Sequence, residues 1–365
     1  SVAPARLASF ESSAPREFNG VPIRYLPADI DEQIAALPAG ESVDSIEYDD
    51  DNRTGKNFAF DQVDEVMDMT LHVGPEYSWD VLKEFLKGAK GEIVSAMYEF
   101  HAKHIKEALE QRLRQDASLK LVLDNASFSS VKNDEDEFDR AEVFDHWAEN
   151  FKFERVVAPE GRSGLISDSY HIKVTVRKDD TFWLSSGNWK AGSSQPLITQ
   201  SQRDDAADED LPGNREWHVV IKNKTLATRF RSHIEQDFET SKELGGGELP
   251  RGRTNETFVD IPLEESPALE RRPPDRVLTP RKLSRRVKVK PLLTPDREGA
   301  VYSEAVLDLI RSARRSLLFQ IPYISMPSNP RQDRGYIDEL ITELTAKLES
   351  LPDARVILRS GGKNL

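Results

Sequence analysis

The sequence predicts a layered α/β protein in which helices cover a mixed sheet. Two observations predict this fold class: helical and strand patterns alternate over residues 77–125, and the same order of elements returns from residue 302. Alternation of this kind is typical of α/β layers, because each element must bury one apolar face against another element. The 365 residues are enough for two domains or one large one.

Helix and strand patterns follow one another closely from residue 77. "YSWDVLKEFLKGAK" places apolar residues at helical spacing, and "EIVSAMYEF" has the composition of a buried strand. "HIKEALEQRLRQ" and "LKLVLDN" then predict a second helix and a second strand. We therefore expect residues 66–240 to form a first α/β domain.

An internal repeat predicts the beginning of a second domain. "YSEAVLDLIRSARRSLLFQIPYIS", from residue 302, resembles "YSWDVLKEFLKGAKGEIVSAMYEF", from residue 77, and "DARVILRSGG" resembles "SLKLVLDN". The shared order of three elements favours a duplication over chance likeness. We expect residues 296–365 to start a second domain that is incomplete within this chain.

Two further segments lack this alternation. Residues 1–65 are rich in Pro, Ala and acidic residues, and we interpret them as an extension that packs onto the first domain. Residues 241–295 are rich in Pro, Gly and basic residues, which predicts a linker between the domains. Within the linker, residues 271–290 hold nine Lys or Arg and one Asp. Such a run favours a solvated face, and the alternative is a basic wall beside a phosphate site.

Composition excludes several classes of protein. There are no cysteines, which excludes disulfides, thiolate metal sites and cysteine nucleophiles. The net charge of −14 repels polyanions at long range and counts mildly against a general nucleic-acid binder. The sequence contains no run of eighteen apolar residues and therefore predicts no transmembrane segment. We expect a soluble protein, cytoplasmic or secreted.

The stretch "SYHIKVTVRKDDTFWLSSGNWK" predicts a hairpin that gathers polar side chains. Its two apolar runs alternate like strands, and "RKDDT" between them is a turn sequence. A two-residue turn at the paired aspartates places His171 opposite Asn188 and Lys173 opposite Ser186. Directly opposed residues lie on the same face of a sheet with Cβ atoms about 5 Å apart.

These residue types suit the chemistry of a phosphodiester. A neutral imidazole such as that of His171 can attack phosphorus and form a covalent intermediate. Lys173 supplies positive charge to the non-bridging oxygens, while Asn188 and Ser186 donate hydrogen bonds. The other nitrogen of the imidazole needs an acceptor, and Glu216, at the start of the apolar strand in "NREWHVVIKN", is the candidate.

The spacing of these residues resembles the motif of the phospholipase D superfamily. That motif is His-x-Lys, four residues, Asp, six residues, then Gly-Ser-x-Asn, and it matches His171, Lys173, Ser186 and Asn188. The resemblance covers residues 70–240, and 296–365 through the repeat. It implies a phospholipase D-like α-β-α sandwich with a mixed sheet flanked by helices.

The motif departs from the family at two positions. Lys178 stands where the family has Asp, and Ser185 stands where it has Gly. The family's Asp is mainly architectural, so the departure concerns the local turn more than the chemistry. Members of the family also carry an acidic residue on a later strand, within hydrogen-bonding reach of the histidine, and Glu216 fits that role.

The resemblance implies a metal-independent phosphodiesterase with no cofactor, acting by hydrolysis or transphosphatidylation through a phosphohistidine. Active members pair two motifs, and no His-x-Lys pair follows Lys173 in this sequence. We therefore expect the second half of the site to come from a continuation of the chain or from another polypeptide. His171 is the nucleophile or the general acid, and the sequence does not distinguish the two roles.

Phospholipid, and hence lipid degradation, is the favoured substrate class, and nucleic acid is the second. The alternative to an enzyme is a non-catalytic assembly or binding module with half a site. His101, in "EFHAKH", is a further candidate for substrate contact, because ligands gather near strand ends in α/β folds. Trp189, beside Asn188, is a candidate of the same kind, with packing in the core as the alternative. The same cluster holds metal-ligand residue types, but a helix start facing solvent is the favoured interpretation, and we expect no metal.

Overall fold

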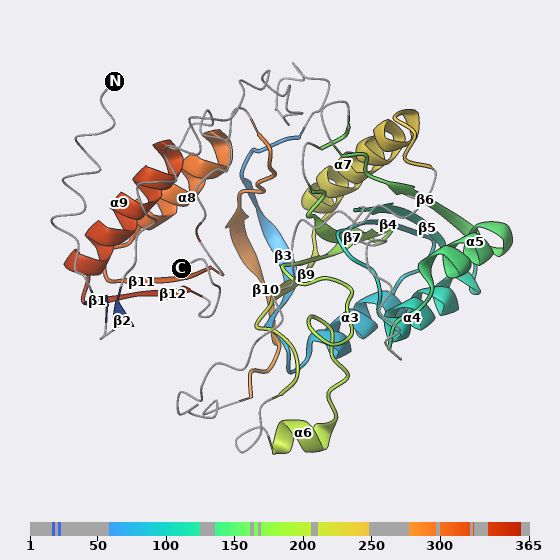
Figure 1. Cartoon of the computed structure of the whole chain (residues 1–365), viewed down its shortest axis with the longest axis horizontal. Helices are drawn as coiled ribbons and strands as arrows, with labels where there is room; N and C mark the ends of the chain where they lie inside the picture. The colour runs from blue at the N-terminus through green and yellow to red at the C-terminus, as the bar shows by residue number, and fades with distance from the viewer. Residues whose placement is uncertain are drawn as a thin grey trace. The chain divides into compact units, whose positions relative to one another are not determined.

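The computed structural model contains two compact units, which are described separately (Figure 1). The larger unit is made of residues Val43–Thr257 and Glu270–Tyr302, and the smaller one includes Ser303–Leu365. The structure describes residues 17–18, 21–22, 58–124, 136–160, 164–166, 169–205, 211–247, 277–296, 300–321, 324 and 335–358. In this described part of the chain, no helix combines the length and the apolar character needed to cross a bilayer.

An eight-stranded mixed sheet forms the centre of the larger unit. Its strand order is β10-β3-β9-β8-β7-β4-β5-β6. β4, β5 and β6 run parallel to one another, and every other neighbouring pair is antiparallel. The strands are β3 (Val63–Val73), β4 (Glu92–Met97), β5 (Ser118–Leu123), β6 (Lys152–Val157), β7 (Lys173–Arg177), β8 (Thr181–Ser185), β9 (Trp217–Lys222) and β10 (Arg281–Val289).

Helices cover both faces of this sheet, because its central strands are apolar on both sides. One face packs on α3 (Ser78–Lys87), α4 (Lys103–Leu113) and α5 (Arg140–Asn150) through a buried cluster that includes Ile93 and Leu121. The other face, with Val94 and Val122, packs on α7 (Lys224–Glu243). Figure 1 shows α7 on one side and α3, α4 and α5 on the other. A short helix, α6 (Gln200–Asp204), lies in the connection from β8 to β9.

The expected fold class, an α/β sandwich with a mixed sheet flanked by helices, is confirmed. The expected boundaries need two corrections. β3 begins at Val63, and Phe58 and Phe60 are already buried, so the larger unit starts before residue 66. Residues 241–295, expected to be a linker, also contribute β10, and every residue of β10 pairs with a residue of β3.

The sequence analysis did not identify β10 as a strand, because its many charged residues are typical of a linker. Its outward residues are mostly basic and meet the acidic residues of β3, as in the 2.9 Å contact from Arg286 Nε to Asp64 Oδ1. Its inward residues Leu283, Val287 and Val289 pack against the cluster on the α7 face. The strand is therefore an edge strand with a charged outer side, a common protection against aggregation.

The smaller unit repeats the element order of the larger one. α8 (Ala300–Ser312), which starts in the larger unit, is followed by β11 (Ser316–Ile321), α9 (Gly335–Ser350) and β12 (Asp353–Leu358). β11 and β12 pair in parallel, as β4 and β5 do. Helix–strand–helix–strand order and parallel pairing are thus common to both units, as the repeat predicts. Two short strands in the expected extension, β1 (Glu17–Phe18) and β2 (Val21–Pro22), pair in antiparallel fashion.

Candidate functional site

The β7–β8 hairpin forms, but its register differs from the expected one by one residue. Val174 lies opposite Leu184, and the loop has three residues, not two. The Asp180 amide donates to the Arg177 carbonyl at 3.2 Å, and Asp180 adopts a φ of 61°. A turn followed by one left-handed residue is the usual three-residue hairpin loop, and aspartate tolerates that conformation.

This register changes which residues face each other at the open end of the hairpin. Continued from Val174, it aligns Lys173 with Ser185, not Ser186, and His171 with Gly187, not Asn188. Asn188 still reaches the site, because the chain after β8 crosses to the segment that follows β4. There the Trp189 amide donates to the Glu99 carbonyl at 3.0 Å, and Asn188 Nδ2 donates to Glu99 Oε2 at 2.7 Å.

Lys173 lies at the centre of the site. Its side chain is only 4% exposed, its Nζ donates to the His171 carbonyl at 3.1 Å, and it lies 4.9 Å from the centre of the Tyr98 ring. Burial lowers the pKa of Lys173 to about 8, and the charges of Glu99, Glu216 and Asp124 partly oppose that shift. The ammonium group is therefore a buried cation that faces three carboxylates.

His171 lies at the surface beside this lysine. Its ring contacts the ring of Tyr98 edge-on, with centroids 4.4 Å apart, and the other side of the imidazole reaches solvent. Loss of hydration on the protein side, together with the positive charge of Lys173, lowers the pKa of His171 to about 4. The imidazole is consequently neutral at pH 7, which is the form able to act as a nucleophile.

Glu216 lies near the lysine but does not hold His171. Its Oε2 accepts a hydrogen bond from Ser186 Oγ at 2.5 Å, and between the described side chains of Glu216 and His171 no hydrogen bond is found. Continuing the β8–β9 register places Gly187 opposite Glu216, and the β7–β8 register places it opposite His171. The glycine thus lies between the two side chains, packed closely against Ser194 and Glu216.

His101 and Trp189 are buried behind the site. Trp189 is 0% exposed and packs edge-on against Phe100 with centroids 4.9 Å apart. His101 is 2% exposed, and its Nδ1 lies 2.8 Å from Arg140 Nη1. Substrate contact by these two buried side chains stays a prediction. Among the described residues, no group of three or more carboxylate and imidazole side chains is arranged to hold a metal ion.

Sequence reasoning did not place two acidic residues in this site, although it noted Glu99 as a metal-ligand type near a strand end. Glu99 follows β4 and bonds Asn188, while Asp124 follows β5 and accepts from the Tyr170 amide at 2.5 Å. Both lie just past the carboxyl ends of neighbouring parallel strands, where ligands of α/β sheets gather. That position is the signal that would have identified them.

A buried hydrogen-bonded chain supports the segment that carries Asn188. The Gly187 amide donates to Ser185 Oγ at 2.7 Å, and Ser185 Oγ lies 2.8 Å from His218 Nδ1. His218 Nε2 in turn lies 3.2 Å from Ser78 Oγ, and its ring stacks on that of His72 at 4.4 Å. Ser185, which departs from the family motif, therefore anchors the loop to the sheet.

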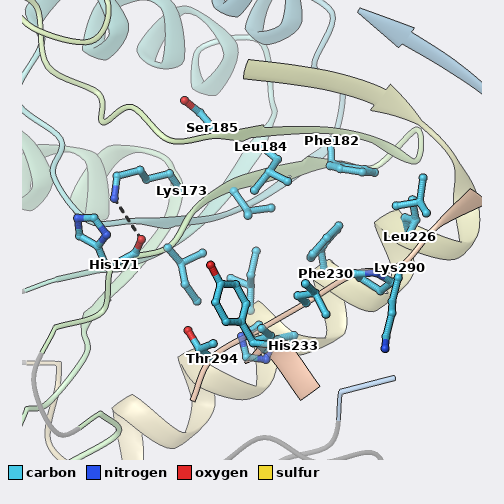
Figure 2. Close-up of a pocket in the computed structure, with 18 of the residues that line it drawn as sticks. His171, Lys173, Phe182, Leu184, Ser185, Leu226, Phe230, His233, Lys290 and Thr294 are labelled. Atoms are coloured by element: carbon cyan, nitrogen blue, oxygen red, sulfur yellow. Dashed lines mark hydrogen bonds between the residues drawn. The ribbon is translucent and has the colours of Figure 1, made fainter. Parts of the chain in front are cut away.

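A cavity of about 720 Å³ opens beside His171 on the α7 face of the sheet (Figure 2). His171, Lys173 and Ser185 line one end of it, and Figure 2 shows Lys290 at the other end. The wall between them is mainly apolar, with Phe182 and Phe230 among its residues. The site thus combines a polar centre with an apolar cavity.

Comparison with solved structures returns proteins of low sequence identity and low TM-score. NucT from Helicobacter pylori is 15% identical, with a TM-score of 0.34, and the match covers 49% of this chain and 98% of NucT. Nuc from Salmonella typhimurium, a phospholipase D family member, is 18% identical, with a TM-score of 0.33 over 49% of this chain and 96% of Nuc. A phosphatidylserine synthase from Haemophilus influenzae is 12% identical, with a TM-score of 0.34 over 49% of this chain and 39% of the synthase.

No family model and no curated protein matches the chain. The TM-scores of 0.33 and 0.34 are too low for these likenesses to establish the fold family of the chain. They carry no information on substrate or reaction. The chemistry of the site therefore has to be argued from the side chains of this chain.

Proposed function

We propose that this chain supplies one half of the active centre of a phosphodiesterase that works through a phosphohistidine. The observation that carries the proposal is the pairing of a neutral, solvent-reaching imidazole, His171, with a buried cation, Lys173. The carbonyl of His171 accepts the hydrogen bond of that lysine, so the two groups are joined. A buried ammonium group at the surface end of a hairpin suits an anionic ligand better than a purely structural role.

In the proposed reaction, the His171 imidazole attacks phosphorus, a P–N bond forms, and the P–O bond to the leaving group breaks. A general acid gives the leaving oxygen its proton. Water or an alcohol then attacks the phosphohistidine, which releases the imidazole and completes hydrolysis or transfer. Lys173 and Asn188 bind the non-bridging oxygens and stabilise the charge that builds up on them, a role that metal ions fill in other phosphodiesterases.

The lowered pKa of His171 favours the nucleophile role over that of general acid, because a group with a pKa of about 4 holds no proton to donate at neutral pH. The general acid is then a second histidine from a second motif, which these 365 residues do not contain after Lys173. We propose that a continuation of the chain or another polypeptide provides it. Glu216 and Glu99, which act on Lys173, would keep its ammonium group charged during turnover.

Phospholipid is the proposed substrate class, and the apolar cavity beside His171 supports it. The net charge of −14 also counts against a long polyanion, although the basic outer side of β10 keeps a nuclease as the second candidate. A non-catalytic binding module is the third, since half a site can bind phosphate without turning it over. A trapped covalent intermediate separates the first two candidates from the third.

The test is His171→Ala in a protein that contains both motifs. We expect turnover of a phosphodiester to fall at least a hundredfold with an unchanged melting temperature, because no neighbouring group can replace the nucleophile. His146→Ala is the matched control, since His146 is an exposed histidine on α5. Rapid quenching with labelled substrate should give an acid-labile, base-stable phosphoprotein that His171→Ala lacks. Retention of more than a tenth of the activity would refute the assignment.

A further inference from the structure

The imidazole of His171 has few contacts that could fix its orientation. In the described part of the chain, neither ring nitrogen of His171 takes part in a hydrogen bond or an ion pair, and Glu216, the expected partner, bonds Ser186. The ring does contact one aromatic side chain, that of Tyr98, with centroids 4.4 Å apart and ring planes at 66°. Because a nucleophile must keep its attacking atom aimed at the substrate, this contact is the one available to orient the imidazole.

The position of Tyr98 is determined by the sheet. Tyr98 directly follows β4, and its amide donates to the Ile172 carbonyl at 3.0 Å. This bond extends the pairing of β4 with β7 by one residue, since Met97 lies opposite Lys173. Ile172 lies between His171 and Lys173 in the sequence, so the backbone places the Tyr98 side chain beside both of them.

Tyr98 also contacts the cation of the site. Lys173 Nζ lies over the Tyr98 ring, 4.9 Å from its centroid. The face of an aromatic ring attracts positive charge, so the ring partly replaces the hydration that the buried ammonium group has lost. An ammonium group has three donor hydrogens, and the His171 carbonyl accepts one of them at 3.1 Å. With a second hydrogen turned towards the ring, one donor is left for a phosphate oxygen.

We propose that Tyr98 is a positioning residue that orients the imidazole of His171 and stabilises the positive charge which that ring gains when it bonds phosphorus. The inference rests on the proposed function for the identity of the nucleophile. It assigns to an aromatic ring the orienting role that the sequence analysis gave to the carboxylate of Glu216.

The charge arises from the proposed bond changes themselves. One nitrogen of the neutral imidazole bonds to phosphorus while the other keeps its hydrogen, and the P–O bond to the leaving group breaks. The ring is then a cation, and its contact with the Tyr98 ring becomes more favourable than it was in the free enzyme. An interaction that strengthens only during the reaction acts on kcat more than on KM.

Two substitutions at Tyr98, made in a protein that contains both motifs, test this role. Tyr98→Phe keeps the ring and should retain at least half of kcat. Tyr98→Leu keeps an apolar side chain without the ring, and it should lower kcat at least tenfold while KM changes less than threefold. A smaller loss of kcat in Tyr98→Leu overturns the proposal. Equal losses in the two variants also overturn it, because they would assign the effect to the hydroxyl group.

Phe151→Leu is the matched control for the loss of a ring that faces a cation. The Arg114 guanidinium lies 5.4 Å from the centroid of the Phe151 ring. Phe151 directly precedes β6, whereas Tyr98 follows the parallel strand β4, so the two rings lie at opposite edges of the sheet. Phe151→Leu should leave kcat and KM unchanged. A loss of kcat equal to that of Tyr98→Leu would trace the effect to a weakened fold and overturn the proposal.

A second measurement needs no turnover and uses the 365-residue chain. With histidine labelled with ¹³C in the ring, the NMR signal of His171 is identified by its absence from His171→Ala. In the wild-type chain and in Tyr98→Phe, this signal should show the ring-current shift of a neighbouring aromatic ring and the relaxation of a restricted side chain. Tyr98→Leu should lose the shift and increase the motion of the imidazole. Unchanged relaxation in Tyr98→Leu overturns the orienting role.

The two measurements separate this inference from the proposed function. If His171→Ala abolishes turnover while Tyr98→Leu keeps it, the proposed function stands and the role of Tyr98 is refuted. If His171→Ala keeps turnover, the proposed function fails, and the relaxation of the His171 ring still decides whether Tyr98 orients it.

Discussion

Removing the charge of Lys173 should stabilise the fold while abolishing phosphate binding. The side chain is 4% exposed, and burial lowers its pKa from 10.5 to about 8. Each pKa unit corresponds to about 1.4 kcal/mol, so the buried charge destabilises the folded state by up to about 3 kcal/mol at pH 7. Lys173→Met keeps most of the length of the side chain and deletes the charge. Loss of the hydrogen bond to the His171 carbonyl offsets about 1 kcal/mol, which leaves a net gain of about 2 kcal/mol.

The pH dependence of this gain follows from the direction of the shift. Between pH 8 and 10.5 the unfolded chain keeps a proton on Lys173 that the folded protein has released. Because the unfolded state then binds more protons, the stability of the wild-type protein rises with pH across this window. The advantage of Lys173→Met is therefore full below about pH 8 and should disappear towards pH 10.5.

Urea unfolding at pH 7 and thermal unfolding from pH 7 to 10.5 measure this effect. Lys222→Met on β9 is the matched control, because Lys222 is exposed and its replacement should change stability by no more than about 0.5 kcal/mol. A loss of more than about 1 kcal/mol in Lys173→Met would refute the reasoning, since it would mean that the carboxylates around the lysine outweigh its desolvation. A gain that persists unchanged at pH 10.5 would refute the electrostatic cause.

Two further predictions concern groups around the site. Burial lowers the pKa of His72 to about 4 and that of His218 to about 3. The unfolded chain therefore binds more protons below about pH 6.5, and the folded protein should lose stability as pH falls below that value. His72→Phe should reduce this loss, measured as the difference between thermal melts at pH 4.5 and 7.5. Equal slopes in both proteins would exclude His72 as the cause. A Cβ on Gly187 would lie 3.0 Å from Ser194 Cβ and 3.1 Å from Glu216 Cγ, so Gly187→Ala should lower turnover at least tenfold. Gly192→Ala, with no atom within 4 Å of its added Cβ, should leave turnover unchanged, and equal activity of the two variants would show that Gly187 is not constrained.

The order of elements could be predicted because it depends on local periodicity alone. The apolar residues of α3 recur at helical spacing, and β4 is mainly apolar because both of its faces are covered. β10 could not be found in this way. Its inward residues alternate correctly, but the basic residues between them gave the composition of a solvated linker. Its role depends on the acidic outer side of β3, which lies more than 200 residues earlier, as in the pair of Ser284 and Asp68.

The motif predicted which residues gather, but not how they contact each other. The register of the hairpin depends on one residue, Asp180, in a left-handed conformation, and side-chain type alone does not determine that choice. Asn188 reaches the site by a crossing of the chain towards Glu99, not by facing His171. The sequence also did not determine whether Trp189 is buried, because a tryptophan beside a site either lines it or supports it.

The glycine between His171 and Glu216 connects these observations to the chemistry. A Cβ at position 187 would press on Ser194 and on the side chain of Glu216, so a larger residue there would displace that carboxylate. Glu216 holds Ser186, and its charge still acts on Lys173. A phosphate bound beside Lys173 would replace the carboxylates as the main partner of the lysine, because it brings negative charge closer to the ammonium group. Binding of the substrate would then raise the pKa of Lys173 from about 8 and restore its full charge when the P–O bond breaks.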